Sequence, residues 1–254
     1  MIDTHAHLVD PAFADDLDSV LDRAASAGVT GVIAVGENLA DARSNLSLAD
    51  RYQGLVHPAA GLFPTYLDEA QAIELEDWMR QHADRWIAVG EIGLDYWKVQ
   101  DEDEREIQRR IFRRFVELAA DLDVPVNVHS RAAAAPVVEC LIEWGARKVQ
   151  LHAFDGRAVK AEPAVEAGYY FSIPPSIVRS RQKQKLVARV PLENLLLETD
   201  SPVLSADPQQ RNEPANVHKS LQAIAEIKAE SQDTVRQAVQ DNTMRLYGSR
   251  LEAG

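Results

Sequence analysis

The stretch Met1-Ile-Asp-Thr-His-Ala-His7 is a short apolar run that ends in two histidines. A nucleotide-binding, doubly wound open sheet would carry a glycine-rich turn after its first strand, and this chain has His5-Ala-His7 there instead. Seven further apolar, β-rich runs follow, most of them separated by stretches with helical spacing. The first strand and its repeated successors therefore favour a closed barrel over an open sheet, which stays the alternative.

The predicted strands cover residues 1–6, 29–35, 56–62, 86–91, 125–129, 148–153, 169–173 and 193–199. Several of them are almost continuous in Val, Ile, Leu and Ala, which is typical of parallel strands buried on both faces. Eight strands alternating with helices over about 250 residues predict an α/β fold of the (β/α)₈ TIM-barrel type. Two additional C-terminal helices are expected near 215–230 and 232–246, packed on the outside of the barrel. We expect residues 1–254 to form a single domain.

Composition sets the broad class of protein. Apolar residues make up 46% of the 254 residues, enough for a sizeable core. No apolar run is long enough to cross a bilayer, and the first residues lack the basic and apolar segments of a signal peptide. Cys140 is the only cysteine, so an internal disulfide is excluded. These features predict a cytoplasmic enzyme, with no membrane association and no obligate protein partner.

The net charge of −13 bears on nucleic-acid binding. An acidic surface does not attract phosphate backbones over long distances, which argues against a basic groove that holds a nucleic acid along its length. A phosphodiester gripped locally by metal ions stays possible, because the formal charge count omits the ions.

Six side chains suited to divalent metals stand at or near the carboxyl ends of predicted strands: His5, His7, Glu91, His129, His152 and Asp200. Barrel active sites form at this end, so residues far apart in sequence are expected to share one pocket. Strongly hydrated groups are costly at a buried strand end unless something binds them. Each has a structural alternative: core histidines, a salt bridge for Glu91 and a turn cap for Asp200. One metal site explains all six together.

Longer motifs surround these residues: Asp3-Thr-His-Ala-His-Leu8, Gly90-Glu-Ile-Gly-Leu-Asp-Tyr96, Val128-His-Ser-Arg131, His152-Ala-Phe-Asp-Gly156, Glu198-Thr-Asp-Ser-Pro202 and Arg211-Asn-Glu-Pro214. In this order the chain resembles the TatD-family metal-dependent hydrolases of the amidohydrolase superfamily. The resemblance implies a TIM barrel with a two-metal centre and nuclease activity on DNA, often from a 3′ end. Some relatives are expected to remove D-amino acids from transfer RNA.

The resemblance also implies a role for each residue. His5, His7 and Asp200 would hold one ion, His129 and His152 the second, and Glu91 would bridge both. Glu91 and Asp200 would be the catalytic residues, with Asp200 orienting the attacking water and accepting its proton. The ions could be Mg²⁺, Mn²⁺ or Zn²⁺, since nitrogen and oxygen ligands accept several metals.

Other residues in the motifs keep two interpretations. Asp95 and Tyr96 could support the metal ligands or order a loop, and Arg131 could grip a phosphate or form a surface salt bridge. Arg211, Asn212 and Glu213 could line the mouth or pin the loop, with loop structure favoured for Glu213. The alternating Arg181, Lys183 and Lys185 are interpreted as a solvated helix face. His57, His82 and His218 are expected to be structural or exposed.

The chain departs from the family pattern in the expected substrate pocket. Gly61-Leu-Phe-Pro-Thr65 replaces a Gly-Ile-His-Pro-His motif, so Phe63 and Thr65 stand where the family has histidines. Ala132 replaces an aspartate, and Ala153 and Asp155 replace a cysteine and a serine. None of the six proposed ligands changes, so the metal centre is expected to be whole and the substrate contacts altered.

The sequence is therefore compatible with three functions. The first is a divalent-metal-dependent deoxyribonuclease that cleaves phosphodiester bonds of DNA, with single-stranded 3′ ends as substrate. The second keeps the metal centre and hydrolyses a carboxylic ester or amide such as D-aminoacyl-tRNA. The third is a barrel that binds metal without catalysis, against which the intact ligand set argues.

Overall fold

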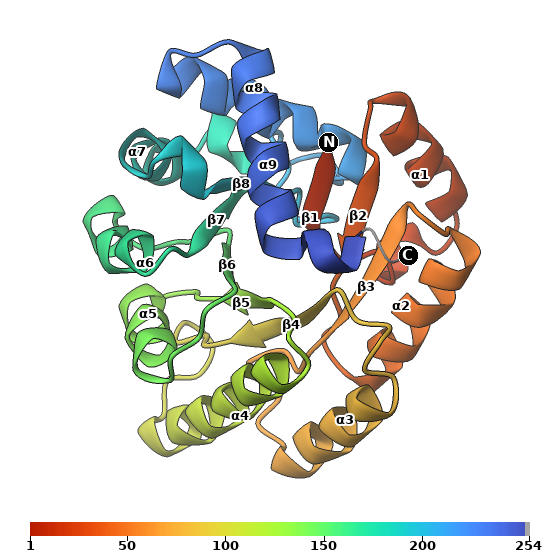
Figure 1. Ribbon diagram of the computed structural model, residues 1–254, viewed down its shortest axis with the longest axis vertical. Helices are drawn as coiled ribbons and strands as arrows, with labels where there is room; N and C mark the ends of the chain where they lie inside the picture. The colour runs from red at the N-terminus through yellow and green to blue at the C-terminus, as the bar shows by residue number, and fades with distance from the viewer. Residues whose placement is uncertain (252–254) are drawn as a thin grey trace.

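The computed structural model describes residues 1–251 as eight parallel strands surrounded by helices (Figure 1). Each strand pairs with the next along the chain, from β1 to β8. The strands are β1 (Ile2–Ala6), β2 (Gly31–Ala34), β3 (Val56–Ala60), β4 (Ala88–Gly93), β5 (Val126–His129), β6 (Val149–His152), β7 (Tyr170–Ile173) and β8 (Leu195–Leu197). The predicted strands are confirmed, each slightly longer or shifted relative to the observed one.

The ring closes between β1 and the segment that follows β8. Ala6 pairs in parallel with Ser201, and the His7 amide donates to the Ser201 carbonyl at 2.8 Å. The Asp200 amide donates to the His5 carbonyl at 2.9 Å. Closure removes free sheet edges and places the segment that carries Asp200 beside the end of β1. The predicted (β/α)₈ barrel is thereby confirmed, and the open sheet is wrong.

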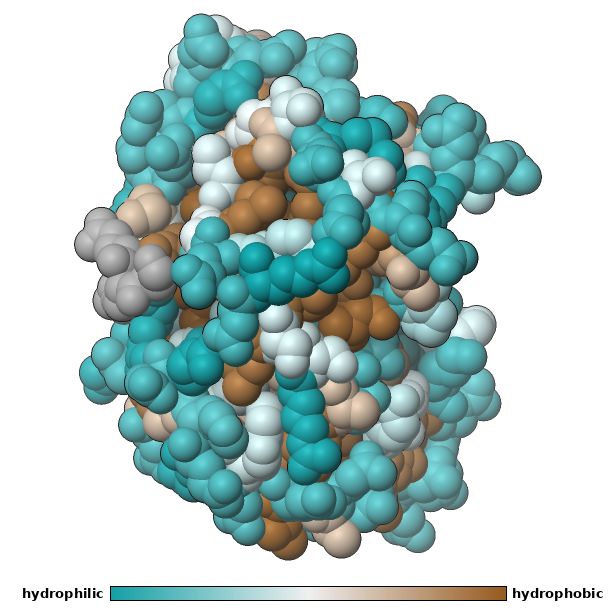
Figure 2. Space-filling view, turned by 90° about the vertical axis from the view of Figure 1, so that its right-hand side faces the viewer, coloured by the Kyte–Doolittle hydropathy of each residue, from teal (hydrophilic) through white to brown (hydrophobic). Residues whose placement is uncertain are grey.

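Helices α1 to α8 lie outside the strands: α1 (Leu17–Ser26), α2 (Leu39–Arg51), α3 (Glu69–Gln81), α4 (Glu102–Asp121), α5 (Ala134–Glu143), α6 (Glu162–Glu166), α7 (Arg181–Arg189) and α8 (Val217–Lys228). The chain then continues into α9 (Gln232–Leu251). Asn38, Asp68 and Asp101 accept backbone N–H groups at the starts of α2, α3 and α4. The apolar faces of these outer helices pack on the outward side of the strands and form the main core. Figure 2 shows mostly hydrophilic residues on the side where α1, α2 and α3 lie, with apolar residues exposed between them.

The C-terminal helix α9 departs from the prediction that both final helices pack outside the barrel. In Figure 1 it crosses the ends of β8 and β1. Leu246 and Tyr247 join Ile33, Ile87 and Leu196 in a second apolar cluster. The Tyr247 hydroxyl donates to Gln150 Oε1 of β6 at 2.5 Å. Helix α9 therefore contributes side chains to the barrel interior, because Leu246 and Tyr247 near its end pack against apolar side chains of the strands.

No helix within residues 1–251 has the combination of length and apolar character that a bilayer crossing requires.

Candidate metal centre

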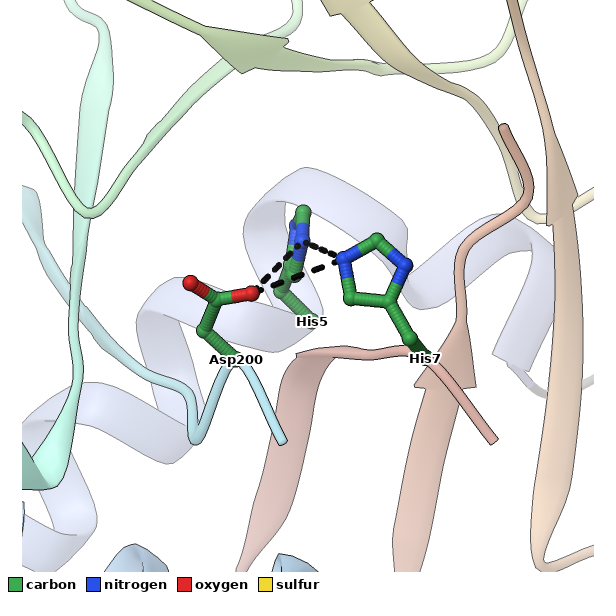
Figure 3. Close-up of side chains that lie close together, drawn as sticks. All are labelled: His5, His7 and Asp200. Atoms are coloured by element: carbon green, nitrogen blue, oxygen red, sulfur yellow. Dashed lines mark hydrogen bonds and ion pairs between the residues drawn. The ribbon is translucent and has the colours of Figure 1, made fainter. Parts of the chain in front are cut away.

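The carboxyl ends of the strands bring the six predicted ligands together. His5 is the last residue but one of β1, and His7 directly follows the strand. Glu91 lies in β4, His129 and His152 end β5 and β6, and Asp200 follows β8. Figure 3 shows His5, His7 and Asp200 converging from the first and last strands of the barrel. The short backbone connection across the β1–β8 seam is what brings these three side chains face to face.

Glu91 lies between two pairs of histidines. Its Oε2 is 3.5 Å from His5 Nε2 and 3.3 Å from His7 Nε2. Its Oε1 is 2.7 Å from His129 Nδ1 and 2.9 Å from His152 Nε2. Each carboxylate oxygen thus faces one histidine pair, which is the arrangement of a carboxylate shared between two sites.

The spacing within each pair suits a shared cation. His5 Nε2 and His7 Nε2 are 3.3 Å apart, and His129 Nδ1 and His152 Nε2 are 3.5 Å apart. Two nitrogens that bind the same tetrahedral ion at about 2.0–2.1 Å lie roughly 3.3–3.4 Å from one another. Asp200 Oδ1 is 3.5 Å from both His5 Nε2 and His7 Nε2, so it completes the first group. The donor set present fits two divalent cations.

Each histidine also has an oxygen near its outward-facing nitrogen. His5 Nδ1 donates to Asn127 Oδ1 at 2.8 Å, a direction set because Asn127 Nδ2 itself donates to the Thr4 carbonyl. His129 Nε2 is 3.1 Å from Asp95 Oδ2. Such contacts orient an imidazole and leave its other nitrogen available to a metal.

The remaining two histidines follow the same pattern with longer contacts. His7 Nδ1 is 3.8 Å from Glu37 Oε1, and the buried His152 Nδ1 is 3.6 Å from Glu198 Oε2 with no hydrogen-bond partner among the described residues. Glu198 is held by the Ala153 amide at 2.8 Å and the Ser172 hydroxyl at 2.5 Å. The sequence did not predict roles for Asn127, Glu37 and Glu198. Asn127 lies inside β5 and Glu37 lies three residues after β2, so only Glu198, directly after β8, carried the strand-end signal.

Opposite charges dominate the electrostatics of this cluster. Burial favours the neutral forms, but the Asp200 and Glu91 carboxylates outweigh it and raise the pKa of His7 to about 10. Burial likewise opposes ionisation of Glu91, yet His152 and His129 hold the pKa of this carboxyl well below its usual range. Burial also opposes ionisation of Asp200, but the hydrogen bond from His7 and the charges of His152 and His5 together lower the pKa of this carboxyl. The carboxylates are therefore ionised and ready to neutralise cations.

A cavity of about 460 Å³ opens above the cluster. His7, Glu91, His129, His152 and Asp200 line it together with Glu37, Phe63, Ser130, Arg131, Ala153, Asp155, Lys183, Val203 and Leu204. The Phe63 ring meets the His129 ring edge to face, with centroids 5.0 Å apart. The apolar ring expected at this strand end therefore forms one wall, directly against a proposed ligand.

Lys183 corrects the interpretation of its helix as a wholly solvated face. Arg181 and Lys185 are exposed, but Lys183 is 8% exposed and lines the cavity. Its ammonium donates to the Ala153 carbonyl at 2.8 Å, and burial lowers the pKa of Lys183. The burial of Lys183 could not be predicted from the charge pattern, because all three positions are basic and α7 directs only one of them inward.

The Arg-Asn-Glu-Pro motif pins the loop after β8. Arg211 forms a two-pronged ion pair with Asp16, at 2.8 and 2.7 Å, and Glu213 pairs with Arg23 at 2.6 Å. Asn212 donates to the carbonyls of Thr199 and Val203. None of the three lines the cavity, so loop structure accounts for the whole motif.

The three histidines outside the site are structural or exposed. His57 is buried near the start of β3, the His82 ring contacts the Trp78 carbonyl at the end of α3, and His218 is exposed at the start of α8.

The neighbouring residues Asp95 and Tyr96 have different roles. Asp95 contacts His129, whereas the Tyr96 hydroxyl accepts from Arg109 and orders the loop.

A closed (β/α)₈ barrel whose strand ends gather four histidines and two acids defines the class of metal-dependent barrel hydrolases. Residues 2–248 match the family described as TatD related DNase. The chain belongs to this family.

Curated relatives and a solved structure agree. The chain is 42% identical to the human protein named deoxyribonuclease TATDN3 over 97% of this chain and 94% of the relative. It is 30% identical to the Bacillus subtilis metal-dependent hydrolase YabD over 97% of this chain and 98% of that protein. The crystal structure of the TatD homologue YjjV from Escherichia coli superposes with a TM-score of 0.90 at 30% identity, covering 98% of both chains.

Proposed function

We propose that this protein is a deoxyribonuclease that hydrolyses phosphodiester bonds at single-stranded 3′ ends of DNA with two divalent metal ions. Membership of the TatD related DNase family and the name of the human relative support DNA as the substrate. The observation that carries the proposal is the position of Glu91, whose two oxygens each face a separate histidine pair.

The ligand assignment follows from these contacts. His5, His7 and Asp200 would hold one ion, His129 and His152 the other, and Glu91 both. When bound, such a pair of cations activates water as a nucleophile and offsets the negative charge of a phosphodiester. Mg²⁺, Mn²⁺ and Zn²⁺ all suit these donors.

Residues of the chain supply the other needs of the reaction. Asp200 lines the cavity and is ionised, so its carboxylate accepts the proton of the attacking water. The Lys183 ammonium also lines the cavity and attracts the phosphate, and the Arg131 guanidinium adds positive charge to the cavity wall. Their local positive charge compensates for a net charge of −13, which would otherwise repel the strand.

The test is cleavage of an end-labelled single-stranded oligonucleotide in Mg²⁺, Mn²⁺ or Zn²⁺, together with measurement of bound metal. The Glu91→Gln variant should lose metal and cleavage together, because one substitution removes the shared charge. Arg131→Ala should keep its metal, since Arg131 contacts no ligand. A wild-type protein that binds metal fully and cleaves no strand under any of the three ions would refute the nuclease proposal.

Phe63 favours a second candidate. An aromatic wall against His129 could accept the side chain of an aminoacyl group, so the same centre could hydrolyse an ester such as D-aminoacyl-tRNA. Parallel assays on charged transfer RNA and on DNA separate the two, and inertness towards charged transfer RNA would eliminate this candidate.

A further inference from the structure

Trp97 is an exposed aromatic side chain beside the metal cavity. It lies in the loop between β4 and α4, and 52% of its surface is exposed. The Arg131 guanidinium carbon lies 3.7 Å from the centre of the Trp97 ring, and Lys98 Nζ lies 4.8 Å from it. Arg131 lines the cavity whereas Trp97 does not, so the contact between them joins the tryptophan to the cavity wall. The pair consists of a flat cation backed by a large ring.

The pair is held firmly relative to the metal centre. Asp95 Oδ1 accepts the amides of Trp97 at 3.0 Å and Lys98 at 2.9 Å, while its Oδ2 contacts His129. The Tyr96 amide donates to the Arg131 carbonyl at 3.0 Å and joins the two loops. One buried carboxylate therefore orients both a proposed ligand and the backbone of Trp97.

Arg131 forms no ion pair with an acidic side chain in residues 1–251, although its charge helps to lower the pKa of the nearby Asp95. Within the described part of the chain, no carboxylate lies within 4.0 Å of its guanidinium. Most arginines of helices α3 and α4 are paired with acids, as Arg80 is with Glu76 and Arg110 with Glu69. Arg131 thus lacks, within the described residues, the surface salt bridge that was its structural alternative, and its side chain is exposed and lines the cavity.

We propose that Arg131, backed by Trp97, is a stacking platform for a nucleobase of the single strand whose phosphodiester is cleaved at the metal centre. The inference rests on the proposed function and specifies which part of the substrate is recognised. Unpaired bases stack on guanidinium planes and aromatic rings irrespective of sequence, whereas bases within a duplex already stack on one another. The platform therefore selects single-stranded over double-stranded ends.

The chemistry distinguishes this role from simple phosphate attraction. A guanidinium is planar and weakly hydrated and can stack against a ring on each face, whereas an ammonium offers only a point charge. Replacing Arg131 by Lys keeps the charge and removes the plane. Replacing it by Gln removes both. Comparing these two variants separates stacking from electrostatics.

The first experiment uses the full-length enzyme with metal and two single-stranded oligonucleotides that differ at one position. One has normal bases, and the other carries a tetrahydrofuran abasic residue next to the cleaved bond. The wild type should show a KM roughly tenfold lower for the base-bearing strand, since one stacked base contributes on that order. Its kcat should be similar for both strands, because the phosphate contacts are unchanged.

Variants of Trp97 and Arg131 test whether these two side chains cause the difference in KM. Trp97→Ala and Arg131→Lys should reduce the ratio of the two KM values towards one, and Trp97→Phe should keep part of it. Arg157→Gln is the matched control, because Arg157 is exposed, lies outside the cavity lining and carries the same charge. A ratio that stays near tenfold in Trp97→Ala would overturn the proposal.

The second experiment measures binding without catalysis. Phosphorothioate versions of the base-bearing and the abasic strand are titrated in the presence of a chelator, and tryptophan fluorescence is followed for each, so that quenching that depends on the base is identified. Quenching should occur in the wild type and disappear in Trp97→Phe, whose other tryptophans (Trp78, Trp86 and Trp144) are more buried.

The two experiments separate the platform from the nuclease. Cleavage of both strands with equal KM would overturn the platform and leave the nuclease standing. Base-dependent quenching without any cleavage would support the platform and refute the nuclease. Absence of both signals would overturn both proposals.

Discussion

Each histidine of the proposed centre uses its two ring nitrogens differently. One nitrogen faces Glu91, and the other faces an oxygen supplied by Asn127, Glu37, Asp95 or Glu198. A metal ligand must present an unprotonated nitrogen, and an oxygen behind the ring retains the proton on the opposite side. The outward oxygens therefore orient the rings and keep the inward nitrogens free to bind metal.

Glu198 provides a test of this division at the scale of one residue. Glu198→Gln keeps the shape of the side chain but removes the negative charge that faces His152 Nδ1. Metal affinity should fall by about 10–100-fold, the usual effect of losing such a partner. Competition with a chelating dye at constant pH measures the change. The exposed Glu193→Gln is the control, and equal affinity in the two variants would contradict the assigned role.

At the scale of elements, the site depends on how closely β4 and β5 approach. Gly90 and Gly93 flank Glu91, and a Cβ on Gly90 would lie 2.6 Å from the Asn127 Cβ. Gly93 has a φ of 143°, and a Cβ there would fall on the His129 carbonyl oxygen. Only glycine permits this contact, which places Glu91 and His129 within reach of each other.

Gly93→Ala should therefore destabilise the protein by about 3 kcal/mol or more, through both backbone strain and overpacking. Gly145→Ala is the matched control, because Gly145 also has a positive φ of 70° but has open space around its Cβ position. That control should cost about 1 kcal/mol. Urea denaturation of both variants gives the comparison, and equal midpoints would show that the close approach is unimportant.

The elements themselves could be predicted well because buried parallel strands are short, apolar and β-branched. The ranges 56–62 and 169–173 match β3 and β7 at their starts within a residue or so. It was harder to predict which side chains of a helix face inward and which face solvent. Lys183 alternates with glutamines in sequence, and only the angle at which α7 packs turns it into the cavity.

At the scale of the whole molecule, α9 completes the barrel. Tyr247 is fully buried and donates to Gln150 Oε1, while Gln150 Nε2 donates to Ser172, which contacts Glu198. A chain of hydrogen bonds thus runs from the C-terminal helix to the acid behind His152. The C-terminal helix α9 therefore contributes side chains to the barrel interior.

Tyr247→Phe should lower the free energy of unfolding by about 1–3 kcal/mol, because Gln150 Oε1 would be left buried without a donor. Tyr66→Phe removes a hydroxyl from an exposed ring and should change stability little. Chemical denaturation of both proteins measures the difference. Unfolding energies within error of the wild type for both would mean that the contact contributes nothing net.

The stability of the molecule should also depend on pH through His57. Burial lowers the pKa of His57 in the folded protein, while the unfolded chain has a value near 6.5. Above that pH both states are neutral and His57 has no effect. As the pH falls below it, the unfolded state binds a proton that the folded state excludes, so stability decreases by up to about 1.4 kcal/mol per pH unit.

His57→Gln should remove this component, so the difference in unfolding energy between variant and wild type should change steadily as the pH falls from 7 to 5. Substitution of the exposed His218 by Gln controls for the loss of a histidine. Parallel pH profiles for the wild type and His57→Gln would rule out the effect.

Sequence by itself determined the order of strands and helices, and through the strand-end rule of parallel barrels it also predicted which six residues meet. The alternation of apolar runs and the His, Glu and Asp residues that end them are local features, readable one segment at a time. Only the tertiary structure decided the oxygens behind each histidine, the inward turn of Lys183, the Arg131–Trp97 contact and the entry of Tyr247 into the barrel. These depend on distances between segments far apart in the chain, which are set by barrel closure and helix packing and leave no local pattern in the sequence.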